Sequence, residues 1–170
     1  MIKRIAVLAE NDYEDLELWY PFLRLREAGH EPIVVGTGSN DAYFSKHGYE
    51  VKVNLPISAA RPEEFHGVII PGGWAPDKLR RHPPVNEFVR DMFESGKLVA
   101  SICHGGSVLI SAGILKGMKV TSVSAIKDDL INAGARFKDE EVVVHRNLIT
   151  SRRPADLPAF MREVLKMLGE

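Results

Sequence analysis

The chain has 170 residues, of which 45% are apolar and 26% are charged, and its formal net charge is −1. This length suits one domain with a real core, and the composition excludes a disordered chain. The balanced charge gives no electrostatic reason to expect a nucleic acid or an anionic membrane as partner, and no apolar run is long enough to span a bilayer.

Two features predict where the protein works. The first residues, Met1 to Arg4, lead directly into an apolar run and lack the hydrophobic region and cleavage site of a signal peptide. Cys103 is the only cysteine, so an internal disulfide cannot form. We therefore expect a protein of the reducing cytoplasm.

Strands and helices alternate along the chain. Apolar runs predict strands at 3–9, 32–37, 67–70, 98–102, 119–122, 141–144 and 148–151. Helical spacing and end signals predict helices at 15–28, 76–81, 85–95, 107–114, 126–133 and from Pro154 onward, with Asp15 as the cap of the first and a short helical turn at 62–65. Segments 43–44 and 49–53 predict a hairpin off the main sheet. This order predicts a three-layer α/β fold around a mostly parallel sheet.

In such sheets, ligands bind beyond the carboxyl ends of the strands. Three loops of distinctive chemistry leave strands at that edge, at 10–14, 71–74 and 103–106. We therefore expect these three loops to form one site.

Cys103 lies where an apolar strand turns into a helix, followed by His104 and two glycines. A free cysteine is often a small buried hydrophobic residue. The position favours a nucleophile, because helix N–H groups stabilise a thiolate and the geometry resembles the nucleophile elbow of hydrolases. His104 is either the base that stabilises this thiolate or only a polar group at the helix start.

Two carboxylates precede the site. Glu14 either complements the dipole of the first helix or, as a protonated carboxyl, donates a hydrogen bond to the sulfur of Cys103. Glu17, one helical turn further on, is expected to support the same wall.

Gly72 and Gly73 follow a strand and are either a simple turn or a source of free backbone N–H groups. In the second case the N–H groups of Gly73 and His104 are the candidate donors of an oxyanion site. The six histidines show no metal-binding spacing, so we expect neither a metal nor another cofactor.

Over nearly its whole length the sequence resembles the PfpI-type intracellular protease family, which shares a superfamily with the parkinsonism-associated deglycase. The motifs that carry the resemblance are 13–15 with Glu17 and Pro21, 46–48, 71–73 with 75–76, 100–105, 109–113, 126–129, 132–134, and 151–152 with 154–157. The resemblance implies that residues 1–170 form one PfpI-like domain, a flavodoxin-like sandwich with the class I glutamine amidotransferase-like fold.

The resemblance also implies roles for residues. Cys103 is the nucleophile, His104 is the catalytic histidine, and Glu14 hydrogen-bonds the thiolate. An acidic residue of a neighbouring subunit reaches the histidine in PfpI-like members, and Asp77 stands at that position, where the family usually has glutamate. A homo-oligomer, either a dimer or a hexamer, is therefore expected. Gly106 and Val123 replace a proline and a tyrosine that are frequent in the family.

These observations lead to a cysteine-dependent hydrolase of the PfpI class, protease- or amidase-like, that acts on a peptide or a small molecule. The alternative is a glyoxalase or deglycase that acts on methylglyoxal-type aldehydes or their protein adducts. A hypothesis of another class is a stress-response protein, an oxidation sensor or chaperone, that uses Cys103 as its oxidisable group.

Overall fold

The computed structural model describes residues 1–170, and a seven-stranded sheet forms its centre in the order β10-β11-β7-β6-β1-β2-β5. The strands are β1 (Arg4–Ala9), β2 (Glu31–Gly36), β5 (Leu55–Pro56), β6 (Gly67–Ile70), β7 (Leu98–Ile102), β10 (Val142–His145) and β11 (Leu148–Ser151). Neighbouring strands are parallel except for β10, which is antiparallel to β11. The predicted fold class is confirmed.

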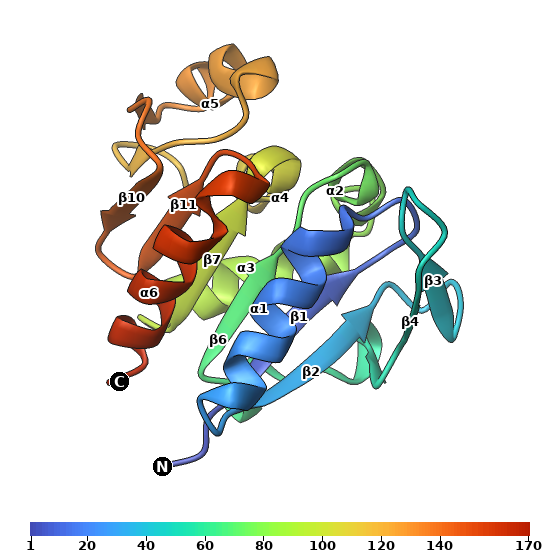
Figure 1. Ribbon diagram of the computed structural model, residues 1–170. Coiled ribbons are helices and arrows are strands. Elements are labelled where there is room, and N and C mark those ends of the chain that lie inside the picture. The colour runs from blue at the N-terminus through green and yellow to red at the C-terminus, as the bar shows by residue number, and fades with distance from the viewer.

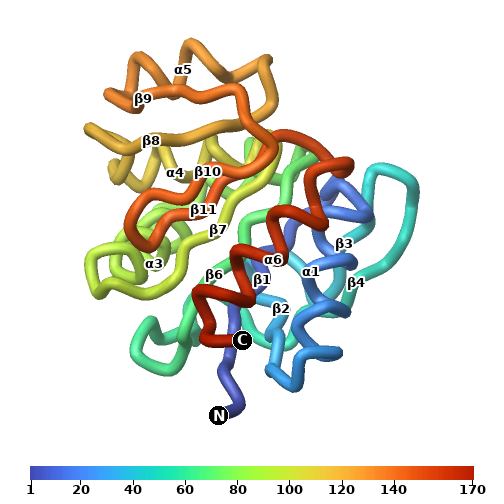
Figure 2. Tube along the Cα trace, turned by 60° about the vertical axis from the view of Figure 1, so that its left-hand side comes forward, coloured from blue at the N-terminus to red at the C-terminus, as the bar shows by residue number.

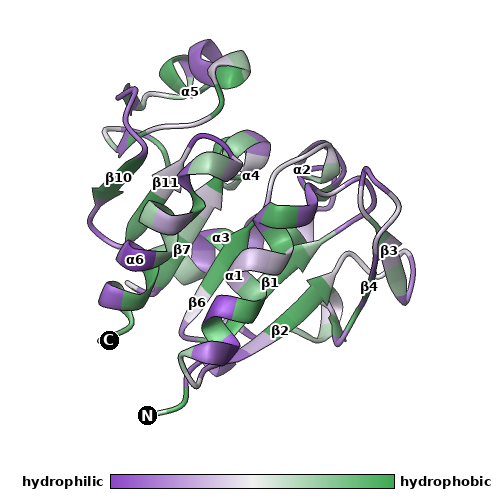
Figure 3. Ribbon diagram, in the orientation of Figure 1, coloured by the Kyte–Doolittle hydropathy of each residue, from purple (hydrophilic) through white to green (hydrophobic).

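Helices cover both faces of this sheet, as the two views in Figures 1 and 2 show. On one face lie α1 (Asp15–Glu27) and α6 (Leu157–Met167), and on the other lie α2 (Ala75–Leu79), α3 (Pro83–Glu94) and α4 (Gly106–Ala112). The central strands are buried on both sides, which explains their unbroken apolar runs (Figure 3). None of the helices combines the length and apolar composition needed to cross a membrane.

Two small sheets lie outside the main one. The hairpin of β3 (Ala42–Phe44) and β4 (Glu50–Lys52) is the predicted excursion. The strand predicted at 119–122 is shorter, because β8 (Lys119–Val120) pairs only with β9 (Arg136–Phe137), and the backbone N–H of Thr121 instead donates to the side chain of Thr150. Between β8 and β9 lies α5 (Lys127–Asn132).

Short 3₁₀ turns complete the fold at Ile57–Ala59, Pro62–Glu64, Cys103–Gly105, Ser124–Ile126 and Pro154–Asp156. The parallel register decides what meets at the carboxyl edge. Ile102 pairs with Ser151 of β11, and Ser101 pairs with Ile70 of β6. Three adjacent strands therefore end within one residue of the same level, with Arg152 opposite Cys103 and Pro71 opposite Ile102.

Candidate active site

Cys103 lies on a sharp turn between β7 and α4. Its φ angle is 60°, in the left-handed region that residues with a Cβ rarely adopt. Gly105 makes the turn possible, because a Cβ there would lie 2.6 Å from the carbonyl oxygen of Ile70. The side chain of Cys103 is partly buried and still reaches the surface. This strained strand-to-helix turn has the geometry of a nucleophile elbow.

Two backbone N–H groups, of His104 and Gly73, face the sulfur of Cys103 and act to lower its pKa. Gly73 has a φ of 79°, and a Cβ there would lie 2.5 Å from both the carbonyl oxygen of Asp12 and the nitrogen of Glu14. A bridge between Tyr13 and Gly73 joins the two loops at this point. The three loops therefore meet in one site, with the two predicted donors facing the sulfur.

The carboxyl group at the sulfur belongs to Glu17. Its side chain is fully buried, its charge acts on Cys103, and its Oε2 accepts a hydrogen bond from the N–H of Gly72 at 2.8 Å. Its other oxygen, Oε1, has no hydrogen-bond partner. One turn into α1, Glu17 faces the 71–74 loop directly.

The structure corrects the position of Glu14. Its carboxylate caps α1, where Oε2 accepts from the backbone N–H of Glu17 at 2.9 Å, so the contact with the sulfur expected of Glu14 is made by Glu17. Asp15, which the sequence predicts as the cap, is the first helical residue, and its carboxylate accepts from Ser45 and contacts His47.

Cys103 and Glu17 form a coupled acid pair. Burial, together with the charge of an ionised Glu17, raises the pKa of Cys103 to about 12. Burial and the neighbouring charge of Glu14 raise the pKa of Glu17 to about 7. Burial opposes the thiolate that the helix N–H groups favour, and the pair holds one proton over a wide pH range. The sulfur is a thiolate only in the form in which Glu17 carries that proton.

His104 lies beside the sulfur, with its Nδ1 atom 3.5 Å from Sγ of Cys103. Burial, and secondarily the charge of Lys46, lower the pKa of His104, so the neutral imidazole predominates at pH 7. Trp74 stacks near the ring with centroids 5.3 Å apart and is itself 62% exposed. Of the two interpretations left open for His104, the geometry favours a group that can exchange a proton with the thiol.

Asp77 lies on α2 at the rim of this site. Its carboxylate forms an ion pair with Arg81 at 2.6 Å, and both side chains are exposed. It makes no contact with His104 of its own chain, so a contact with a histidine across an interface stays a prediction. No group of three or more His, Cys, Asp or Glu side chains lies close enough to hold a metal ion.

The sequence reasoning gave Glu17 a secondary place and missed Lys46 as a charge acting on both Glu17 and His104. A sequence signal for Glu17 existed. A residue three positions after a helix cap lies in the first turn, on the side of the neighbouring loops. No local pattern places Lys46, because the 46–48 turn reaches the site through long-range contacts, among them the hydrogen bond from the Lys46 N–H to the carbonyl oxygen of Tyr13.

The raised pKa of Glu17 predicts how stability depends on pH. Between pH 4.5 and about 7 the unfolded chain loses this proton while the folded protein keeps it, so the free energy of unfolding falls as pH rises through this window. The expected loss is about 3 kcal/mol, at about 1.4 kcal/mol per pKa unit. Urea denaturation of the wild type and Glu17→Gln at pH 5 and pH 8 measures it. An equal pH dependence in both proteins would contradict the assignment.

The fold and the elbow together define an α/β enzyme with a cysteine nucleophile. Residues 3–167 match the model of the DJ-1/PfpI family. The chain is 48% identical over 165 residues to the deglycase PfpI of Pyrococcus furiosus, covering 97% of this chain and 99% of the relative. It is 43% identical to the putative cysteine protease YraA of Bacillus subtilis, with 99% of each chain covered.

A solved structure, a two-domain protein of Anabaena variabilis with a DJ-1/ThiJ/PfpI-like and a ferritin-like domain, superimposes with a TM-score of 0.96 at 44% identity. The match covers 98% of this chain and 48% of that longer protein. The chain belongs to the DJ-1/PfpI family, which confirms the resemblance drawn from its motifs.

Proposed function

We propose that this protein is a cysteine-dependent deglycase, which hydrolyses the adducts that methylglyoxal-type aldehydes form with amino groups or thiols. The observation that carries the proposal is the position of the Cys103 sulfur on a strained elbow, between two backbone N–H donors and a buried carboxyl. The name of the relative from P. furiosus supports this substrate class. The exposed face of Trp74 beside His104 leaves the sulfur open to an adduct carried on a larger molecule.

The first step follows from this geometry. The sulfur of Cys103 forms a bond to the carbonyl carbon of the adduct, and the thiol proton passes to the carboxylate of Glu17. The carbonyl becomes an oxyanion within reach of the N–H groups of Gly73 and His104. Neutral His104 is placed to move protons in the later steps. Overall, one water molecule is consumed, and the free amine and a 2-hydroxy acid are released.

The experiment supplies two substrates to the same protein. One is a methylglyoxal adduct of a simple amine, with lactate and free amine as the products measured, and the other is a fluorogenic peptide. We expect lactate and amine from the adduct and no peptide cleavage. Measuring amine release at two ratios of adduct to free methylglyoxal separates adduct hydrolysis from conversion of the aldehyde. Peptide cleavage without lactate would replace the proposal by the peptidase that the name of YraA suggests.

We also propose a homo-oligomer, working in the cytoplasm as part of a stress response. Leu16, Tyr20 and Leu23 form an exposed apolar stripe at helical spacing along α1, which supports a contact between copies. In such an assembly the exposed Asp77 of one copy would face His104 of another. Light scattering after chromatography gives the mass, and a monomer at micromolar concentration would refute the assembly.

A further inference from the structure

A concave site lies at the end of β11, the strand next to β7. It is a cavity of about 330 Å³ between α5, the β8–β9 sheet and the end of β11. The residues that matter for its chemistry are Ser124, Lys127, Phe137, Asp139, Arg152 and Arg153. Three of them are cations and one is an acid. Cys103, Glu17 and His104 do not line this cavity. The chemistry described above therefore gives no role to its charged residues.

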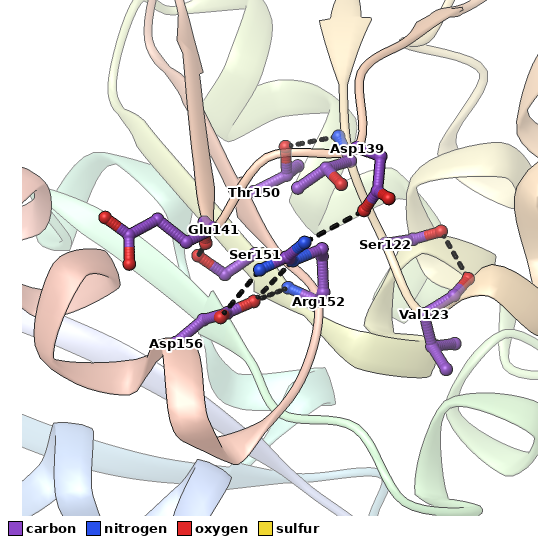
Figure 4. Close-up of polar contacts among 9 residues, drawn as sticks. Ser122, Val123, Asp139, Glu141, Thr150, Ser151, Arg152 and Asp156 are labelled. Atoms are coloured by element: carbon purple, nitrogen blue, oxygen red, sulfur yellow. Dashed lines mark hydrogen bonds and ion pairs between the residues drawn. The ribbon is translucent and has the colours of Figure 1, made fainter.

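The side chain of Arg152 is hydrogen-bonded to two carboxylates of the chain. Its Nε donates to Oδ2 of Asp156 at 2.9 Å, its Nη2 to Oδ1 of the same residue at 3.2 Å, and its Nη1 to Oδ1 of Asp139 at 2.9 Å (Figure 4). These bonds occupy Asp139, the one acidic residue of the cavity lining, and the buried Asp156. Arg152 is therefore a fixed part of the wall, and the two carboxylates more than balance its charge.

The other two cations have no acidic partner. Neither Lys127 nor Arg153 forms an ion pair or a side-chain hydrogen bond, although Lys127 lies over the ring of Phe137 at 5.7 Å. The hydroxyl of Ser124 is free as well, whereas that of Ser122 donates to the carbonyl oxygen of Val123. A concave surface with two unpaired cations and a free hydroxyl is chemically suited to an anionic group.

The cavity lies at the level of the nucleophile. Ser151 of β11 pairs with Ile102 of β7, so Arg152 and Cys103 leave neighbouring strands at the same edge. On the other side, α5 reaches the start of α4, since a Cβ on Gly106 would lie 3.3 Å from Cδ2 of Leu130. Figures 1 and 2 show α5 standing beyond the carboxyl ends of β7 and β11.

We propose that this cavity is an anion subsite in which Arg153 and Lys127 bind a carboxylate or phosphate of the substrate molecule and thereby orient its adduct at Cys103. The role of this subsite in catalysis rests on the proposed deglycase function, whereas the binding of an anion in the cavity does not. Arg153 and Lys127 are thus specificity-determining residues, and Arg152 holds the wall against which the anion lies.

The kinetic test uses methylglyoxal adducts of three matched amines: ethanolamine, which is neutral, β-alanine, which carries a carboxylate, and O-phosphoethanolamine, which carries a phosphate. We expect KM to be about tenfold lower for at least one anionic adduct than for the neutral one. The anionic adduct with the lower KM shows whether the subsite binds a carboxylate or a phosphate. Arg153→Gln and Lys127→Gln should raise the KM of the anionic adducts to that of the neutral one, so that the difference disappears. Arg162→Gln, an exposed arginine on α6, removes the same charge elsewhere and should preserve the difference.

A binding test decides the subsite even if no adduct is turned over. Inorganic phosphate and acetate are titrated into the whole protein at low ionic strength, with heat or amide chemical shifts as readout. We expect binding of at least one anion that weakens about tenfold in Arg153→Gln and is unchanged in Arg162→Gln. Absence of binding, or equal binding in both variants, would overturn the subsite. Failure of turnover alone would overturn the deglycase function.

Discussion

Replacement of Cys103 by serine is expected to lower the rate of adduct hydrolysis by roughly 10³-fold or more, because every later step depends on the bond that the sulfur forms. Serine has nearly the same size and can occupy the same strained turn, so the free energy of unfolding should change by no more than about 1 kcal/mol. Lactate release and urea denaturation of the same preparation separate the two effects.

His104→Gln serves as the companion variant to Cys103→Ser. It keeps the backbone N–H that faces the sulfur and removes only the imidazole 3.5 Å away. We expect a loss of roughly 10²-fold, typical of a group that transfers protons. If Cys103→Ser retained more than a tenth of the wild-type rate, the nucleophile would have to be sought elsewhere.

Gly73→Ala is expected to cost more than about 3 kcal/mol of stability and to abolish activity. The φ angle of 79° already disfavours a side chain, and the new Cβ would lie 2.5 Å from backbone atoms of the 10–14 loop. The two loops would separate, and the Gly73 N–H would leave the sulfur.

Gly96→Ala is the matched control for this variant. Its φ is 73°, nearly the same, but a Cβ there meets no atom within 4 Å. It should cost only about 1 kcal/mol and leave activity intact. Equal losses in the two variants would mean that backbone conformation alone, and not the junction of the two loops, determines the effect.

The fold was predictable because its main signals are local. Apolar runs such as 67–70 and 98–102 coincide with β6 and β7, and parallel pairing then brings the loops that follow to one edge. The missed strands, β5 and β9, have only two residues each, which is too short for any periodicity. Gly72 and Gly73 were placed correctly, because a glycine pair after a strand is itself a backbone signal.

The electrostatics of the site were not predictable in the same way. Whether Glu14 or Glu17 reaches Cys103 depends on where α1 begins, because the side chain of the cap residue turns back onto the helix N–H groups. The raised pKa of Cys103 arises from burial and from the buried Glu17, which the sequence does not display. The unpaired cations beside Arg152 likewise emerge only when α5 and β11 are brought together.

The claim that Cys103 and Glu17 share one proton is tested most directly by the rate of Cys103 alkylation between pH 5 and 10. In the wild type we expect an inflection near pH 7, where the pair loses its first proton, followed by a plateau up to pH 10. In Glu17→Gln the two steps, near 7 and near 12, should merge into a single inflection between them, because only the thiol still titrates. Glu14→Gln removes the charge that helps to raise the pKa of Glu17, so its first inflection should move to lower pH while the plateau remains. Identical profiles in the wild type and Glu17→Gln would contradict the shared proton.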